Sequence, residues 1–254
     1  MAHMNNYRQQ LGLSLIELMI AMAISSFLIL GVTQIYIDNK RSYSFQQNLA
    51  ENQEGSRFAL LLLQQQLSKT GYRRRPDESM ESAFPADSVT VTGCNFVAGE
   101  TVKSLATNSI CIRYQPKDGT DRDCLGNLPT TPANFASPYT KATQRFVQRL
   151  SINGDDELTC TNATTTAALV SGVVDLRIEY GVGNAVAPQT ISSYIRTAPT
   201  SSQPILAIRY TLLARSSGTQ SRDAVTITSA LAKWKTLTGA TNAQELAIAT
   251  PDKG

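Results

Sequence analysis

The sequence predicts an α+β protein, in which one long N-terminal α-helix precedes a mostly antiparallel β-sheet head. Residues 11–37 are mainly apolar and carry one charge, Glu17, and no proline interrupts residues 13–70, so a single helix can run through both ranges. After Pro76, apolar and polar residues alternate with a period of two, which indicates strands with one buried face. The chain of 254 residues leaves ample length for a folded domain after the helix.

The first half of this helix, residues 13–37, is predicted to span a membrane. Residues 18–37 carry no charge and would form about 30 Å of helix, the thickness of a bilayer's hydrocarbon. A cleaved secretory signal would have an apolar core of only about 7–15 residues. Glu17 makes a plain anchor the less favoured interpretation, because an ionised carboxylate in hydrocarbon costs roughly 2.5–3.5 kcal/mol. No basic residue lies between Arg8 and Lys40, so we expect a partner from outside this span.

The second half of the helix, residues 38–71, is predicted to be amphipathic. Its apolar residues are Leu49, Phe58 and Leu62, with Leu61 and Leu67 as further candidates, and they stand among Gln, Asn and Glu residues, as in a helix half-buried against a domain. Gly71 is expected to end the helix, since glycine accepts the left-handed conformation found there. The arginines at 73–75 are expected to form a solvated turn, with one arginine packed against an acidic partner; a subunit contact is the alternative.

The head is predicted to comprise residues 72–254. Its clearest pair of strands is 174–180 with 207–213, each with one apolar and one polar face. One side of this sheet should pack on the amphipathic half of the helix. Residues 116–143 and 183–204, rich in Thr, Pro, Asn and Ser, are predicted to be long surface loops. The expected strands are 88–92, 109–115, 144–152, 173–182, 205–215 and 224–228.

Four cysteines, Cys94, Cys111, Cys124 and Cys160, all follow the apolar span. We therefore expect two disulfides in an oxidising compartment, with three pairings open. Their spacing contains no Cys-x-x-Cys knuckle, so a metal site is not expected.

Enzymatic chemistry is not expected. The only histidine is His3, which excludes histidine-based catalysis from the rest of the chain. No phosphate-binding glycine loop occurs, and no cofactor is expected. The acidic clusters at 118–123 and 153–157 favour turns rather than calcium sites. With 23 basic and 20 acidic residues, the chain lacks the strong basic excess of a nucleic-acid-binding protein.

A hydrophilic leader ending in Gly12, followed by Leu13, Glu17 and a long apolar helix, resembles the signal of type IV prepilins. The resemblance implies a type IV pilin-like fold. It also implies that a membrane peptidase removes residues 1–12 and methylates Leu13, a position where most members carry Phe. In that family the carboxylate equivalent to Glu17 pairs with the N-terminal amine of a neighbouring subunit and sets register.

Further motifs are similar to the PilW family of minor pilins, among them 67–74, 111–116 and 178–182. This resemblance implies assembly with other minor pilins and the major pilin, incorporation near the fibre tip, motility, cell adhesion and display of a tip adhesin. It further implies a Gram-negative inner membrane, with the head in the periplasm and later on the extracellular fibre.

The chain departs from these relatives at two places. It lacks their aspartate-rich loop, having Gly-Asn-Ala-Val-Ala at 183–187, and it ends without their last strand, so we expect a truncated C-terminus. Two alternatives remain open: a minor, J-like pseudopilin of type II secretion, and a membrane-anchored surface adhesin.

Overall fold

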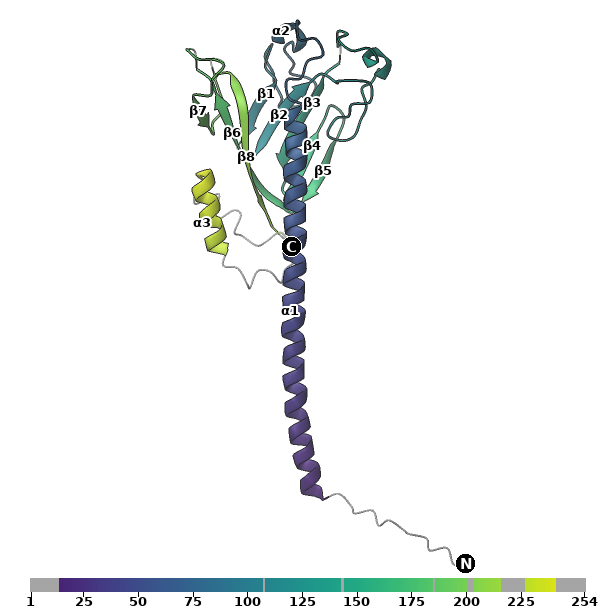
Figure 1. The fold of residues 1–254 in the computed structure, drawn as a ribbon, viewed down its shortest axis with the longest axis vertical. Helices are drawn as coiled ribbons and strands as arrows, with labels where there is room; N and C mark the ends of the chain where they lie inside the picture. Colours follow the sequence, from purple (N-terminus) through teal and green to yellow (C-terminus); the bar gives the residue numbers. More distant parts are fainter. Residues whose placement is uncertain are drawn as a thin grey trace, which may run out of the picture. The chain divides into compact units, whose positions relative to one another are not determined.

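The computed structural model describes residues 14–106, 108–142, 144–184, 186–200, 203–215 and 227–240 (Figure 1). The chain forms two compact units, residues 1–47 and 48–254. The first helix, α1 (Leu15–Ser68), contributes residues to both. The expected α+β architecture, a long N-terminal helix and an antiparallel sheet head, is confirmed.

The helix α1 runs without interruption because it contains no proline. Its end is fixed by Gly71, which has a φ of +73° and donates its N–H to the carbonyl of Arg113 on the first sheet, at 3.0 Å. A left-handed residue just after the last turn reverses the chain direction. The predicted stop near Gly71 is therefore confirmed, with Ser68 as the last helical residue.

The described part of the head forms two antiparallel sheets. The first has the order β1-β2-β3-β4-β5, with strands β1 (Val102–Ala106), β2 (Ser109–Tyr114), β3 (Phe146–Ile152), β4 (Glu157–Thr161) and β5 (Thr166–Ser171). The second has the order β7-β6-β8, with strands β7 (Ser193–Ile195), β6 (Val173–Val182) and β8 (Ile205–Ala214). The predicted pairing of the two long strands is confirmed, since Ile178 of β6 lies opposite Tyr210 of β8.

The main core lies between both sheets and residues 48–68 of α1. Ala59 and Leu63 of the helix are fully buried against apolar residues of the strands. Alternation along β6 puts one set of side chains into this core. The members that β6 contributes are Val173, Leu176, Ile178, Tyr180 and Val182. The prediction that a sheet face packs on the second half of the helix is confirmed.

The opposite, polar face of β6 contacts a second helix, α3 (Ile227–Thr238). Arg177 of β6 pairs with the buried Asp175 at 2.6 Å, and its guanidinium lies 5.2 Å from the ring centroid of Trp234. The predicted strand 224–228 is wrong where the structure describes it, because residues 227–228 begin this helix. The β-branched residues at 225–228 favoured a strand in the sequence, but the buried apolar residues Leu231 and Trp234 follow helical spacing.

Other short elements differ from expectation. Residues 88–92 form bends held by Asp87 rather than a strand, and the adjacent chain makes only the bridge between Asp87 and Phe96. Strands β1, β4, β5 and β7 were not predicted. The loops contain two short helices, α2 (Met80–Ala83) and the 3-10 helix η1 (Pro132–Phe135).

Candidate assembly surface

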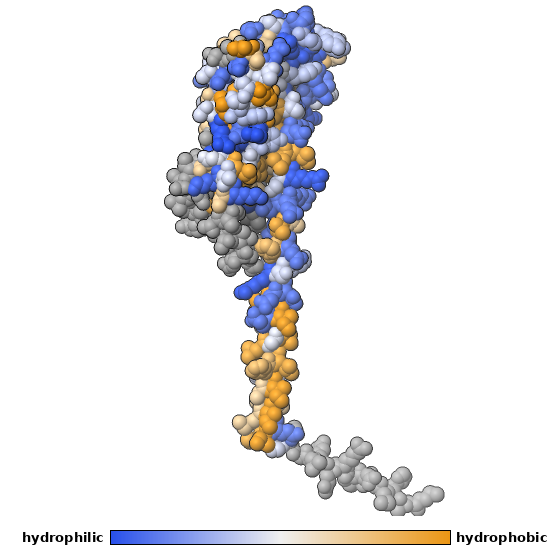
Figure 2. All heavy atoms as spheres, turned by 60° about the vertical axis from the view of Figure 1, so that its left-hand side comes forward, coloured by the Kyte–Doolittle hydropathy of each residue, from blue (hydrophilic) through white to orange (hydrophobic). Residues whose placement is uncertain are grey.

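The N-terminal half of α1 presents apolar side chains in every direction. From Leu15 to Ile37 its large apolar residues are all exposed, with Phe27 at 82 %. The helix is long and apolar enough to cross a membrane, and none of the qualifying stretch is buried by the rest of the chain. Figure 2 shows this part of α1 as a nearly continuous hydrophobic surface. Such a helix requires an apolar environment that its own head does not supply.

Two polar side chains of this segment are satisfied within the helix. Ser26 and Thr33 donate their hydroxyls to the carbonyls four residues earlier, at 2.8 and 2.7 Å. Gln34 donates to both carboxylate oxygens of Asp38, at 3.2 and 3.3 Å, where the sequence becomes polar. The hydroxyls therefore add little to the cost of placing this segment in hydrocarbon.

Glu17 lies in the first turn of α1 and is exposed. The carboxylate interacts favourably with the positive end of the helix dipole. Among the described residues, no ion pair includes it. Gly12 and Leu13, the expected processing positions, lie outside the described residues.

The second half of α1 buries a stripe that differs in part from the one predicted. Ala59, Leu63 and Gln66 are buried, whereas Phe58 and Leu61 are 53 % and 55 % exposed. Leu49 is also exposed, whereas Leu62 and Leu67 contact the core as predicted. Residues 59, 63 and 66 follow the three- and four-residue spacing of one helix face, and Phe58 and Leu61 lie outside that face.

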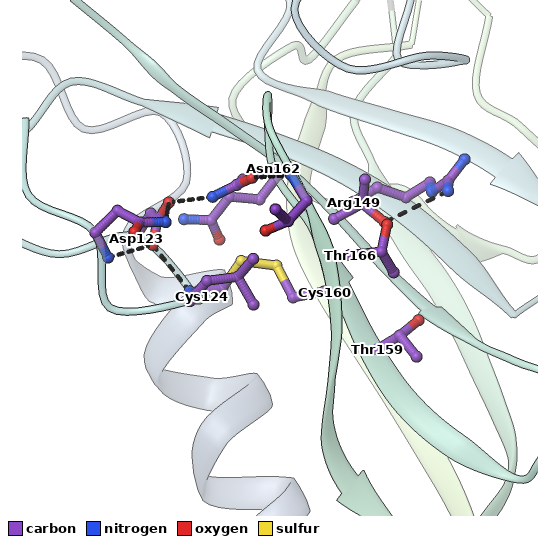
Figure 3. Close-up of a disulfide and its surroundings, with 12 residues drawn as sticks. Asp123, Cys124, Arg149, Thr159, Cys160, Asn162 and Thr166 are labelled. Atoms are coloured by element: carbon purple, nitrogen blue, oxygen red, sulfur yellow. Dashed lines mark hydrogen bonds between the residues drawn. A yellow bond between two sulfur atoms is a disulfide. The ribbon is translucent and has the colours of Figure 1, made fainter. Parts of the chain in front are cut away.

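Two disulfides stabilise the head. Cys94 pairs with Cys111, and Cys124 pairs with Cys160, with Cα–Cα distances of 5.7 and 6.3 Å. The first ties the 84–100 loop to β2, and the second ties the 116–143 loop to β4 (Figure 3). The expected two bridges are present, and the structure supplies the pairing that the sequence left open.

The prediction for the triple arginine is confirmed in part. Arg75 pairs with Asp77 at the surface, as expected for one arginine with an acidic partner. Arg74, however, is buried and donates to main-chain carbonyls of the long loop, including Pro116 at 3.3 Å and Thr140 at 3.3 Å. Its guanidinium also lies 5.2 Å from the ring centroid of Phe135. A fork of five N–H donors can satisfy several buried carbonyls at once.

A second arginine, which sequence reasoning did not single out, organises the other long loop. Arg113 of β2 is fully buried and donates to the carbonyls of Phe84 and Val97, at 3.1 and 2.8 Å. The aromatic rings of Phe84 and Phe96 lie 5.5 and 4.6 Å from its guanidinium carbon. Burial lowers the pKa of Arg113 to about 10, so the guanidinium remains charged at neutral pH. Alternation along β2 places it on a buried face, but its carbonyl partners could not be found from sequence.

The acidic clusters form hydrogen-bonded turns. Asp123 accepts the backbone N–H groups of Leu125 and Asn127, at 2.9 and 2.8 Å, and the side-chain amide of Asn162 at 2.7 Å (Figure 3). Asn153 accepts N–H groups within the second cluster. Within the described residues, no group of three His, Cys, Asp or Glu side chains could hold a metal ion.

Comparisons with known families agree with this architecture. The profile described as "Prokaryotic N-terminal methylation motif" matches residues 7–33, which include Gly12, Leu13, Glu17 and the start of α1. The profile described as "Type IV Pilus-assembly protein W" matches residues 140–246, from before β3 through α3. No curated protein and no solved structure matches the chain significantly.

An exposed apolar helix with a methylation motif, continuous with an antiparallel head, defines a type IV pilin-like subunit. Both matched families are structural pilin families rather than enzyme families. The match over residues 140–246 and the methylation motif at 7–33 together support a type IV pilus protein similar to the PilW family.

Proposed function

We propose that this chain is a minor pilin that primes assembly of a type IV pilus with other minor pilins and is incorporated near the fibre tip. The observation that carries the proposal is the methylation motif at residues 7–33, joined to a helix whose apolar half is exposed all round. In this role the apolar half is buried first by the inner membrane and then by the helices of neighbouring subunits. The major pilin continues the fibre below the minor-pilin complex, which supports motility and displays a tip adhesin.

Processing precedes assembly in this proposal. A prepilin peptidase cleaves between Gly12 and Leu13 and methylates the new amine. The disulfide-bonded head faces the periplasm of a Gram-negative cell, an oxidising compartment in which both bridges persist. The proposed divisions are a leader (1–12), a membrane half (13–37), an amphipathic half (38–71) and a head (72–254).

Glu17 sets the register between subunits. Its carboxylate is exposed in the isolated chain and lies one helical turn from the new N-terminus. In a low-dielectric fibre core an unpaired carboxylate is costly, and pairing with the amine of the adjacent subunit removes most of that cost. A subunit at the apex has no neighbour above it to supply the amine, so we place this chain just beneath the apex.

Mass spectrometry of the membrane-extracted protein tests the processing step. We expect a chain beginning at methylated Leu13 in cells with an active prepilin peptidase. Gly12→Val is the matched variant and should accumulate with its leader attached. An intact Met1 in wild-type protein from such cells would contradict the proposal.

Crosslinking tests the role of Glu17. Cysteine substitutions near the N-terminal end of α1 should crosslink to other minor pilins, and Glu17→Ala should reduce that product while processing remains normal. If Glu17→Ala gave as much crosslinked product and as many pili as wild type, the register role would be refuted. The description of the matched family favours a pilus over type II secretion; loss of secretion with normal pili in a deletion strain would reverse that preference.

A further inference from the structure

The head carries a polar hollow of about 400 Å³ on the side of the first sheet away from the main core. Its walls are residues 89–92 before the Cys94–Cys111 bridge, Arg149 of β3, and the turn 161–166 between β4 and β5. Six of its lining residues are threonines, and among the described residues no Asp or Glu lines it. The hollow is therefore rich in hydroxyls and carries a positive charge.

The strand register explains how this hollow forms. Arg149 lies opposite Cys111 on one side and Thr161 on the other, and Thr161 lies opposite Thr166. Directly opposed residues share one face of a sheet, so these side chains form a row across β2 to β5. Figure 3 shows Arg149 beside Thr166, with Asn162 in the turn above them.

Arg149 has donors to spare. A guanidinium offers five N–H groups. One on Nη1 goes to the carbonyl of Thr92 at 3.3 Å, and one on Nη2 goes to Oγ1 of Thr161 at 3.4 Å. The Nε group is buried without a hydrogen-bond partner, and within the described part of the chain no carboxylate pairs with Arg149. A cation with two long hydrogen bonds and no counter-ion is unusual in a partly buried position.

The surroundings indicate which counter-ion fits. A planar carboxylate matches the fork of an arginine, and threonine hydroxyls can both donate to and accept from a polyol. Val89, which is 88 % exposed, and the threonine methyl groups offer apolar contact beside these polar groups. We propose that this hollow binds an acidic sugar, with the carboxylate on Arg149 and the sugar hydroxyls on the threonines. This is a ligand site additional to the assembly role, and its test requires no pilus.

The proposal is tested by measuring, with saturation-transfer NMR, how sodium glucuronate binds to the detergent-solubilised full chain. Glucose and acetate serve as the neutral-sugar and simple-carboxylate probes. We expect saturable binding of glucuronate, at least about tenfold tighter than either probe, because each probe lacks one half of the recognition. Equal binding of glucose would show that Arg149 is not used, and equal binding of acetate would show that the threonines are not; either result overturns the proposal.

A negative charge introduced at the rim gives a variant that preserves the fold. Thr165 is exposed and lines the hollow, so Thr165→Glu places a carboxylate near Arg149 without disturbing the core. We expect Thr165→Glu to weaken glucuronate binding by about tenfold. Thr165→Gln introduces a side chain of the same shape as Glu but without its charge, and it should change binding by less than about threefold. Unchanged binding in Thr165→Glu would overturn the proposal.

Arg149→Gln tests the cation directly, and Arg75→Gln is its control on another surface. Arg149→Gln should abolish measurable binding, and Arg75→Gln should leave it unchanged. The emission of the single tryptophan, Trp234, should match wild type in both variants and shows that the head is folded. Two results would refute the site. One is retained glucuronate binding by folded Arg149→Gln. The other is no binding by wild type when glucuronate is present at roughly 50 times the concentration of protein sites, an excess chosen for a millimolar ligand.

Discussion

Removing the disulfide between Cys124 and Cys160 should destabilise the head more than removing the other bridge. The two bridges close loops with sequence separations of 36 and 17 residues. The chain-entropy relation gives about 3.8 kcal/mol for the longer loop and about 3.1 kcal/mol for the shorter. The expected difference between the two variants is therefore only about 0.7 kcal/mol, but its direction is defined.

The assay is urea unfolding of the detergent-solubilised full chain in three forms: wild type, Cys124→Ala/Cys160→Ala and Cys94→Ala/Cys111→Ala. Trp234 is the single tryptophan and is only 4 % exposed, so its emission reports the head. Replacing cysteine by alanine also leaves a cavity, and the two sites differ in how buried they are. Wild type under reducing conditions lacks both bridges but has no such cavity, and it serves as the control. Both midpoints should fall, and the slope of the transition should rise as the unfolded state expands.

Two results would refute the entropy reasoning. If Cys94→Ala/Cys111→Ala were clearly the less stable variant, packing in the small cluster around Val91, Phe96 and Val147 would outweigh loop length. If neither variant lost stability, the loops would be held by their hydrogen bonds alone.

Three other perturbations separate the parts of the molecule. Arg74→Met should destabilise the head by about 3 kcal/mol or more, since it leaves several buried carbonyls unpaired, whereas Arg75→Met should leave the stability nearly unchanged; both are measured by urea unfolding. Asp87→Asn should destabilise the head by about 1 kcal/mol at pH 7, measured in the same way across pH. Leu61→Asp should leave the unfolding midpoint nearly unchanged but reduce crosslinking to other pilins, because Leu61 is exposed in the isolated chain.

The pH dependence for Asp87 has a defined sign. Partial burial opposes its charge, but the hydrogen bonds from the Thr90 hydroxyl and from the backbone N–H groups of Val89 and Thr90 prevail and lower its pKa below the ordinary 3.8. A lowered pKa contributes stability that is complete above 3.8 and is lost as the pH falls through the value in the folded protein. The difference between Asp87→Asn and wild type should thus shrink only below pH 3.8; a difference that vanished near neutrality would contradict this assignment.

Each control also has an opposing outcome. Equal destabilisation by Arg74→Met and Arg75→Met would mean that the carbonyl contacts of Arg74 contribute nothing beyond a surface ion pair. A large loss of stability in Leu61→Asp would mean that this face is already covered by the chain itself.

Sequence periodicity was sufficient to predict the helices and strands whose pattern repeats over many residues. The apolar half of α1 and the ten-residue strands β6 and β8 repeat their pattern often enough to be recognised, and Gly71 marks the helix end. The strand β5, Thr-Ala-Ala-Leu-Val-Ser, has an exposed first half with no apolar alternation, so it gave no signal. The face of α1 was assigned correctly for Leu62 and Leu67 and wrongly for Phe58 and Leu61, because these two are as apolar as the residues that are buried.

The contacts that hold the loops could not be predicted at all. Arg74 reaches carbonyls between 42 and 66 residues away, and Arg113 reaches Phe84 across 29. Carbonyl acceptors exist at every residue, so no sequence pattern identifies the ones that an arginine will find. The disulfide pairing was open for the same reason, because it depends on which loop crosses which strand.

These loop contacts bear on how the subunit would assemble. Each long loop is held by both a disulfide and a buried arginine, so its surface is ordered before any neighbour binds, and little conformational entropy remains to be lost on lateral contact. The face of α1 with Phe58 and Leu61 is exposed in the isolated chain, and in the proposed role a neighbouring subunit would cover it. Loss of a loop contact should therefore weaken the isolated head, whereas loss of the helix face should weaken only the assembly. A variant of the helix face that unfolded the head would show that the two surfaces do not act independently.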